Sequence, residues 1–129
     1  MTLSDVQRAY LDEILYAVVA TLNADGTLQQ TMVWYLLDGD SIRFSVGAGS
    51  VKVRNLRRSP TISVTVPDGR RHLTLQGTAA VEPFDPDLRE RLAMRYLGPE
   101  GVAAWLQRRP DVPRLSVRVT VLKAYGQGV

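Results

Sequence analysis

Apolar and polar residues alternate along most of this chain with the two-residue period of half-buried β-strands. The alternation predicts six strands, over residues 16–22, 27–37, 41–46, 61–66, 71–82 and 114–122. Turn-forming sequences rich in Asn, Asp, Gly and Pro follow the first, second and fourth of them. Strands of this length with tight turns favour a closed antiparallel barrel over an open sheet, because closure removes exposed strand edges.

One glycine, Gly77, lies inside the fifth predicted strand, where it shares a face with the apolar side chains of Leu73, Leu75, Ala79 and Val81. A glycine weakens a strand unless the backbone bulges there or another backbone approaches closely. The sequence therefore predicts a bulge or a close approach at Gly77.

Helices are expected at three places around these strands. A capping box at Ser4 and Gln7 predicts a first helix of about two to three turns. Its apolar stripe would comprise Val6, Tyr10, Leu11 and Ile14. Asp85 followed by Pro86 predicts another helix start, with a break at Gly98-Pro99 and a second short helix over 100–107.

The remaining helix belongs to the most informative segment, from Phe44 to Pro60, which reads as strand, Gly-rich turn and short helix. Ser50 is a good N-cap, and Pro60 disfavours helix at the residue before it. Lys52 therefore lies near free backbone N–H groups and the positive end of the helix dipole, an unfavourable place for a cation without an anion nearby. The segment resembles a phosphate-binding turn, although the P-loop pattern is absent. The alternative is a helix with a solvated basic face.

The amino-acid composition excludes several kinds of functional site. The chain has 129 residues, which predicts one domain over 1–129. It has no cysteine, which excludes disulfides, Cys-ligated zinc and thiol catalysis, and its one histidine, His72, argues against a His-ligated metal. No apolar run reaches membrane-spanning length and no signal-peptide pattern opens the chain, so a soluble cytoplasmic protein is expected.

The net charge of +3 comes from basic residues that cluster. One group lies in the short helix, one in the turn after the fourth strand and one before the last strand. They are Lys52, Arg54, Arg57 and Arg58; Arg70 and Arg71; and Arg108, Arg109 and Arg114. Such clusters favour anionic ligands. No aromatic residue is interleaved with the cations of the helix, which argues against nucleic-acid binding.

Four blocks of the sequence together resemble a known family. They are Ala20 to Gly26, Thr31 to Tyr35, Asp38 to Ser45, and the Lys-x-x-Asn-Leu-x-x-x-Pro motif from Lys52 to Pro60. With them the chain resembles the pyridoxamine 5′-phosphate oxidase-like split β-barrel over about residues 15–122. Within that superfamily it is most similar to the flavin/deazaflavin oxidoreductases of actinobacterial type.

The resemblance implies a mainly β protein with peripheral helices, a six-stranded antiparallel split β-barrel that forms a homodimer with two cofactor grooves at the interface. By that resemblance, Phe44 and Ser45 lie beside the cofactor's ribityl phosphate, and Ser50, Val51 and Lys52 form its phosphate-binding turn. The strand along the tricyclic ring would contain Thr31, Met32, Val33 and Trp34. His72 would reach the cofactor held by the second subunit.

Two departures from the true oxidases matter. Val51 stands where they have an arginine, and the chain lacks their C-terminal Arg-x-His element, which argues against pyridoxamine phosphate oxidation. The sequence of the short helix is more similar to that of family members that use the 8-hydroxy-5-deazaflavin coenzyme F420. Without an arginine at that position, a singly charged phosphodiester is expected to bind better than the terminal phosphate of FMN. Arg54, Arg57 or Arg71 could then meet the tail carboxylates of F420.

The resemblance thus implies an oxidoreductase that binds F420 and transfers a hydride to an unsaturated or conjugated small-molecule acceptor. An FMN-dependent reductase or oxidase and a non-catalytic cofactor carrier are the alternatives. The sequence identifies no catalytic side chain, and none is required, because the cofactor itself supplies the hydride chemistry. Trp34 and Tyr35 lie on opposite faces of one predicted strand, so one of them faces the barrel interior. Trp105 is interpreted as a packing anchor of the last helix.

Overall fold

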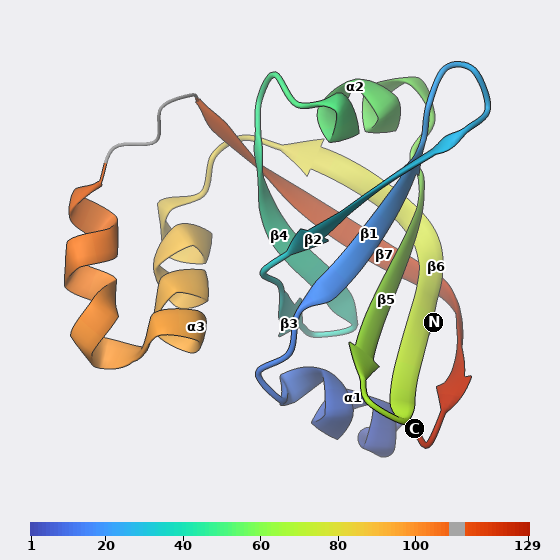
Figure 1. Ribbon diagram of the computed structural model, residues 1–129, viewed down its shortest axis with the longest axis horizontal. Helices are drawn as coiled ribbons and strands as arrows, with labels where there is room; N and C mark the ends of the chain where they lie inside the picture. The colour runs from blue at the N-terminus through green and yellow to red at the C-terminus, as the bar shows by residue number, and fades with distance from the viewer. Residues whose placement is uncertain (109–112) are drawn as a thin grey trace.

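The computed structural model of the protein describes residues 1–108 and 113–129, and every strand pairing in it is antiparallel (Figure 1). The elements follow one another as α1 (Asp5–Asp12), β1 (Ala17–Leu22), β2 (Leu28–Val33), β3 (Leu36–Asp38), β4 (Ser41–Gly47), α2 (Val51–Arg58), β5 (Thr61–Asp68), β6 (Arg71–Glu82), α3 (Pro86–Gln107) and β7 (Arg114–Gln127). The expectation of a mainly β protein with peripheral helices is confirmed.

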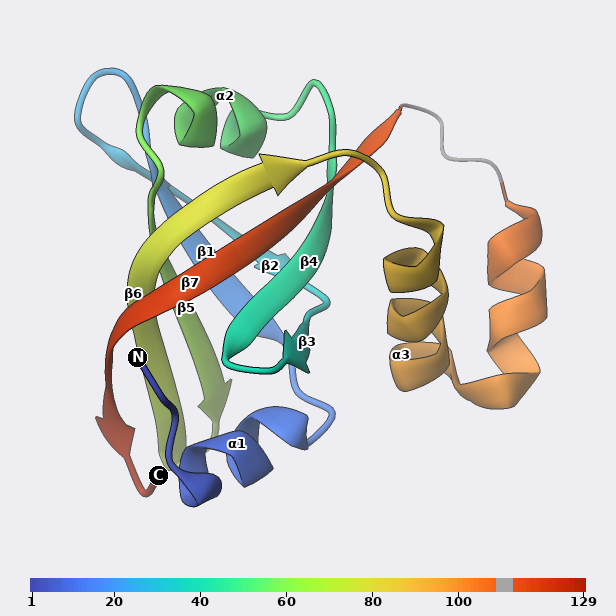
Figure 2. The same ribbon diagram turned by 180° about the vertical axis from the view of Figure 1, so that it is seen from behind.

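The strands form one sheet in the order β2-β1-β5-β6-β7-β4-β3. Figures 1 and 2 show this sheet curling around a common interior, with α2 across one end, α1 across the other and α3 to one side. Both ends of the sheet, β2 and β3, are consecutive along the chain. The chain therefore crosses from one end of the sheet to the other between Val33 and Leu36.

The prediction of six strands was wrong in number, because the described residues form seven. The expected strand over 27–37 is broken at Trp34 and Tyr35. At the break, the Tyr35 N–H donates to the Tyr96 hydroxyl (3.1 Å), and that hydroxyl lies 3.1 Å from the Tyr35 carbonyl oxygen. A side chain of α3 thus satisfies backbone groups that a neighbouring strand would otherwise pair.

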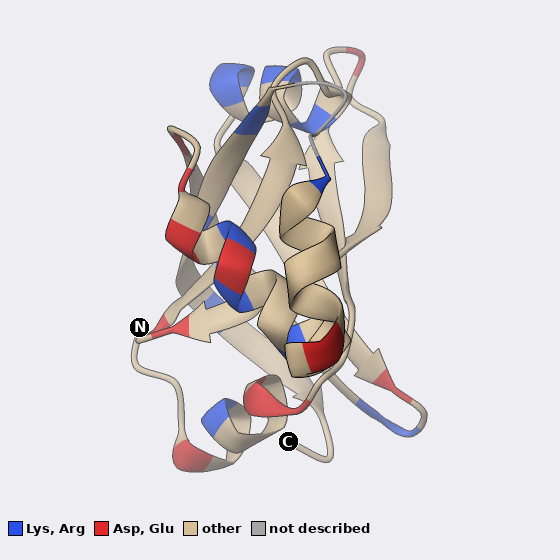
Figure 3. Cartoon of the chain, turned by 90° about the vertical axis from the view of Figure 1, so that its left-hand side faces the viewer, with Lys and Arg blue, Asp and Glu red and all other residues tan. Residues whose placement is uncertain are grey.

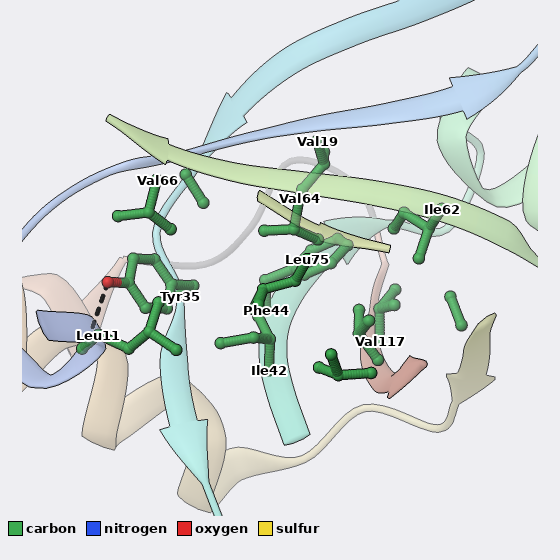
Figure 4. Close-up of a cluster of buried hydrophobic side chains, with 14 of the residues drawn as sticks. Leu11, Val19, Tyr35, Ile42, Phe44, Ile62, Val64, Val66, Leu75 and Val117 are labelled. Carbon is green, nitrogen blue, oxygen red and sulfur yellow. Dashed lines mark hydrogen bonds between the residues drawn. The ribbon is translucent and has the colours of Figure 1, made fainter. Parts of the chain in front are cut away.

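The interior is filled by alternate side chains of the strands (Figure 4). Tyr35 is fully buried there and donates its hydroxyl proton to the carbonyl of Leu11 (2.9 Å), while Tyr10 donates to the carbonyl of Val66 (2.8 Å). These bonds attach α1 to the barrel end. The predicted stripe of α1 was wrong in part, because Val6 and Ile14 are exposed and only its middle residues pack inward. The capping box is confirmed.

At Gly77, the predicted irregularity of the fifth expected strand is present. The register between β6 and β7 shifts between Gln76 and Gly77. A Cβ at Gly77 would lie 1.9 Å from the carbonyl oxygen of Thr120, so the backbones approach too closely for any side chain. Both expected explanations, a bulge and a close approach, hold at this one residue.

α3 consists of two helical segments that join at Gly98, whose φ of 71° only glycine adopts readily. The Asp85 side chain accepts hydrogen bonds from the first helical N–H groups, as predicted for the cap. Trp34 stacks on Tyr96 with 5.0 Å between centroids and lies 5.2 Å from Trp105, which confirms Trp105 as a packing anchor. None of the described helices combines the length and the apolarity that crossing a membrane requires.

Candidate functional site

The site is built on α2, which the sheet holds by its buried Asn55. The Asn55 amide, 3% exposed, donates to the hydroxyl of Thr21 (3.0 Å) and to the side-chain oxygen of Asn23 (2.9 Å). Arg58 adds a bond from its guanidinium to the Leu22 carbonyl (2.6 Å). The asparagine of the Lys-x-x-Asn-Leu motif is therefore a structural residue that holds the helix against the end of β1.

Replacing Asn55 with alanine should lower the free energy of unfolding by about 2–3 kcal/mol, because two buried hydrogen bonds are lost and their acceptors lose a donor. Urea unfolding monitored by circular dichroism measures this. Arg57→Ala on the same helix is the control, since Arg57 is exposed and its loss should change the unfolding free energy by less than about 0.5 kcal/mol. Equal effects of the two substitutions would mean that Asn55 does not anchor the helix.

Lys52 points from the first turn of α2 toward β2. Ser50 caps this helix by accepting the Val53 N–H (3.4 Å), as predicted. The ammonium of Lys52 donates to the hydroxyl of Thr31 (2.8 Å), so two of the predicted site residues from distant parts of the chain meet. Partial burial, and then the positive charge of Arg114, lower the pKa of Lys52.

Arg114, the first residue of β7, completes this group of side chains. In the sheet it pairs with Gly47, where the Gly-rich turn starts, and its Nε donates to the hydroxyl of Ser45 (3.2 Å). Burial, and then the charge of Arg89, lower the pKa of Arg114. No acidic side chain forms a salt bridge with Lys52 or Arg114 in the part of the chain that is described.

Thr31, Ser45, Lys52 and Arg114 together form what we call the cationic cradle. It offers two hydroxyls, two cations and the free backbone N–H groups at the start of α2, which are the donors that proteins use for phosphate. Figure 3 shows Lys and Arg gathered on α2, with no acidic residue on that helix. The donor set fits the phosphate of a flavin or deazaflavin.

The other predicted residues are placed less directly. Phe44 is fully buried in the barrel interior, so only its backbone could reach a cofactor. Val33 packs against the same interior, whereas Met32 is 65% exposed and Val51 38% exposed. Trp34 already stacks on side chains of α3. Their predicted contacts with a cofactor stay predictions.

His72 lies at the opposite end of the sheet from α2, beside the β5–β6 turn, where it pairs with Pro67 and Gln127 (Figure 1). Within one chain it is therefore not brought to the cradle. Its predicted role depends on a second subunit and stays a prediction.

Several of the basic residues are already engaged. The sequence suggested Arg71 as a partner for the carboxylates of the cofactor. In the structure, Arg71 already forms salt bridges with Glu13 (2.9 Å) and Asp68. Arg54 donates to the Gly49 carbonyl (2.9 Å) and braces the Gly-rich turn. Arg57 is exposed, and Arg109 lies outside the described residues.

A curled antiparallel sheet that carries a cationic cradle at the start of a short helix is the architecture of a split-barrel, phosphate-anchored cofactor protein. The family model described as pyridoxamine 5′-phosphate oxidase matches residues 3–128, and the chain belongs to that family. Over 129 aligned residues it is 31% identical to the F420H(2)-dependent biliverdin reductase of Mycobacterium tuberculosis (strain CDC 1551 / Oshkosh), with 96% of this chain and 88% of that protein covered.

Two solved structures are also similar to the whole fold. One, an F420 reductase, superposes with a TM-score of 0.80 at 27% identity and covers 95% of this chain and 98% of its own. The other, a conserved hypothetical protein from Mycobacterium tuberculosis, has a TM-score of 0.78 at 23% identity and covers 98% of this chain and 86% of its own. The resemblance inferred from the sequence motifs is confirmed.

Proposed function

We propose that the protein is an oxidoreductase that binds coenzyme F420 and uses it to reduce an unsaturated or conjugated small molecule. The observation that carries the proposal is the bond from Lys52 to Thr31 at the start of α2, with the cation Arg114 placed by β7 against the Gly-rich turn that precedes this helix. The similarity to an F420H(2)-dependent biliverdin reductase and to an F420 reductase supports F420 as the cofactor. When bound, F420 supplies the hydride chemistry.

The protein's own residues then have the tasks of binding and orientation. Lys52 and the N–H groups of α2 would hold the phosphate, which would fix the cofactor at the point where its ribityl chain ends. The ring would extend along β2 from Thr31 toward Trp34, which stacks on Tyr96 and Trp105 of α3. No side chain is required as a general base in this arrangement. Positioning the cofactor beside the acceptor is the protein's main contribution to the rate.

FMN is the alternative cofactor, and the structure changes how it compares with F420. With Val51 in place of an arginine, the phosphate turn itself contains one cation, Lys52. The structure brings a second cation, Arg114 of β7, to the start of this turn. Charge at the phosphate alone therefore does not reject FMN. The preference for F420 rests on the relatives and on the exposed Arg57, which could meet carboxylates of the F420 tail. A non-catalytic carrier would bind F420 equally well.

Turnover separates an enzyme from a carrier. Reduced F420 bound to the protein should be reoxidised faster when a conjugated acceptor is added, as followed by the recovery of the oxidised deazaflavin absorbance. The control is Lys52→Ala at the same coenzyme concentration, which should reoxidise it more slowly. Tight binding without reoxidation over a broad panel of acceptors would support the carrier.

We further propose that the working form is a homodimer. Leu28 and Met32 are each 65% exposed on β2 and Leu122 is 64% exposed on β7, so large apolar side chains lie on the outside of the sheet. Light scattering at micromolar concentration should give twice the mass of one chain. A stable monomer would contradict this proposal and remove the predicted role of His72 in a shared groove.

A further inference from the structure

We propose that Arg114 is a second phosphate-binding residue, which together with Lys52 holds the cofactor phosphate between β7 and α2. This inference rests on the proposed function, because it concerns the same site. Neither the Gly-rich turn nor the Lys-x-x-Asn-Leu motif contains Arg114, which is brought to the turn by the pairing of β4 with β7.

The position of Arg114 is fixed from both sides. Its backbone pairs with Gly47, and the carbonyl of the preceding Pro113 accepts the Ala48 N–H (2.8 Å), so the start of β7 is fastened to the Gly-rich turn. The bond from Nε to the Ser45 hydroxyl (3.2 Å) then orients the guanidinium. Among the described residues, this is the side-chain hydrogen bond that Arg114 makes, and none of them engages its terminal NH₂ groups.

Electrostatics gives a reason for an anion at this place. Lys52 and Arg114 are each partly buried, and the charge of Arg114 disfavours the charged form of Lys52. Arg89 adds a third positive charge that acts on Arg114. Its partners among the described residues are backbone carbonyls, including those of Trp105 (3.0 Å) and Leu106 (3.3 Å). Within residues 1–108 and 113–129 no acidic side chain forms a salt bridge with Lys52, Arg89 or Arg114. Partly buried like charges raise the free energy of the folded state, and a bound phosphate would offset that cost.

The other arginines near this end of the barrel differ from Arg114 in how their donors are used. Arg54 and Arg58 donate to backbone carbonyls, of Gly49 and Leu22 respectively. Arg114 instead contacts a hydroxyl, which can itself donate to a phosphate oxygen. A planar guanidinium whose NH₂ groups are engaged by none of the described residues can match the bidentate geometry of phosphate recognition. Arg114 is therefore suited to bind the anion, whereas Arg54 and Arg58 are suited to hold the turn and the helix.

The first test uses inorganic phosphate and does not depend on the cofactor. The melting temperature of the wild-type protein should rise on adding phosphate beyond its change in chloride of equal ionic strength, because an anion that binds only the folded state stabilises it. Arg114→Gln, which removes the charge but keeps a hydrogen-bonding side chain, should lose most of this specific rise. Arg57→Ala removes the same charge from an exposed position and should keep it.

Arg114→Lys is the second variant, because it keeps the charge and should retain part of the phosphate response even if the glutamine variant folds poorly. A purely structural role predicts instead that both variants lose stability without phosphate and respond to phosphate as the wild type does. A phosphate response of Arg114→Gln equal to that of Arg57→Ala overturns the proposal.

The second test uses F420 and its phosphate-free deazaflavin. Arg114→Gln should bind F420 about ten-fold more weakly or worse, a loss of about 1.4 kcal/mol, and bind the phosphate-free compound as the wild type does. Unchanged F420 affinity would reject the role of Arg114 and leave the proposed function intact. A wild-type protein that responds to phosphate but binds no deazaflavin would keep the anion site and reject the proposed function.

Discussion

Replacing Gly77 with alanine should destabilise the protein by about 3 kcal/mol or more, the largest stability loss we expect from adding a single methyl group. The new Cβ would lie 1.9 Å from the Thr120 carbonyl oxygen and 2.9 Å from its carbonyl carbon. Both atoms belong to the backbone of β7, so they cannot move aside as a flexible side chain would. Relief requires β6 and β7 to separate, which breaks ladder hydrogen bonds next to the buried core.

Gly49→Ala is the matched control for this prediction. A Cβ at Gly49 meets nothing within 4 Å, and its backbone is not in the left-handed region, so the same methyl group should cost little there. Chemical unfolding of both variants measures the difference. A Gly77→Ala variant as stable as Gly49→Ala would show that the close approach of β6 and β7 is not a fixed feature of the fold.

Replacing Lys52 with alanine should weaken F420 binding by about ten- to a hundred-fold, the loss of one charge-assisted contact of about 1.5–3 kcal/mol. The lysine holds its ammonium beside Thr31, within the cradle and close to Arg114. Fluorescence titration of the wild type and the variant measures the dissociation constants. Arg57→Ala is the control on the same helix and should keep tighter F420 binding than Lys52→Ala. Unchanged affinity in Lys52→Ala would mean that the lysine is only a solvated surface residue.

The same variant should not lose stability when the cofactor is absent. Burial and Arg114 lower the pKa of Lys52 in the folded protein below the ordinary value of 10.5. At pH below the folded-state pKa the charged lysine costs stability, and this cost falls as the pH rises from that pKa to the unfolded value. The stability of the wild type relative to Lys52→Ala should therefore increase with pH over that range. A relative stability that falls as the pH rises would contradict the lowered pKa.

The strands could be predicted from alternation because it reflects which side chains face the interior, but the break in 27–37 could not. Trp34 and Tyr35 lie in a continuous apolar run from Met32 to Leu37, which contains no turn-forming residue to mark the break. At the break, the hydroxyl of Tyr96, from a helix far along the chain, accepts the Tyr35 N–H and donates its proton to the Leu15 carbonyl (2.6 Å). Tyr35 then fills the interior that the pattern assigned to one of the two aromatics.

The candidate site was predictable where it is local and missed where it is not. Ser50 and Lys52 could be predicted from neighbouring residues alone, because a cation directly after an N-cap is unfavourable unless an anion binds there. The structure adds the contact of Lys52 with Thr31. Arg114 was visible only as one of several basic residues, because its closeness to the turn depends on the register of β4 with β7. Phe44, which the family resemblance placed beside the cofactor, has its side chain in the core, so its predicted contact would involve its backbone and stays a prediction.

The central claim, an F420-binding oxidoreductase, is tested most directly by titrating the purified protein with F420 and with FMN and following fluorescence. We expect F420 to bind at least ten-fold more tightly, a difference of about 1.4 kcal/mol, because its tail carboxylates add contacts that FMN lacks. FMN binding as tight as or tighter than F420 binding would contradict the claim and indicate a flavin enzyme.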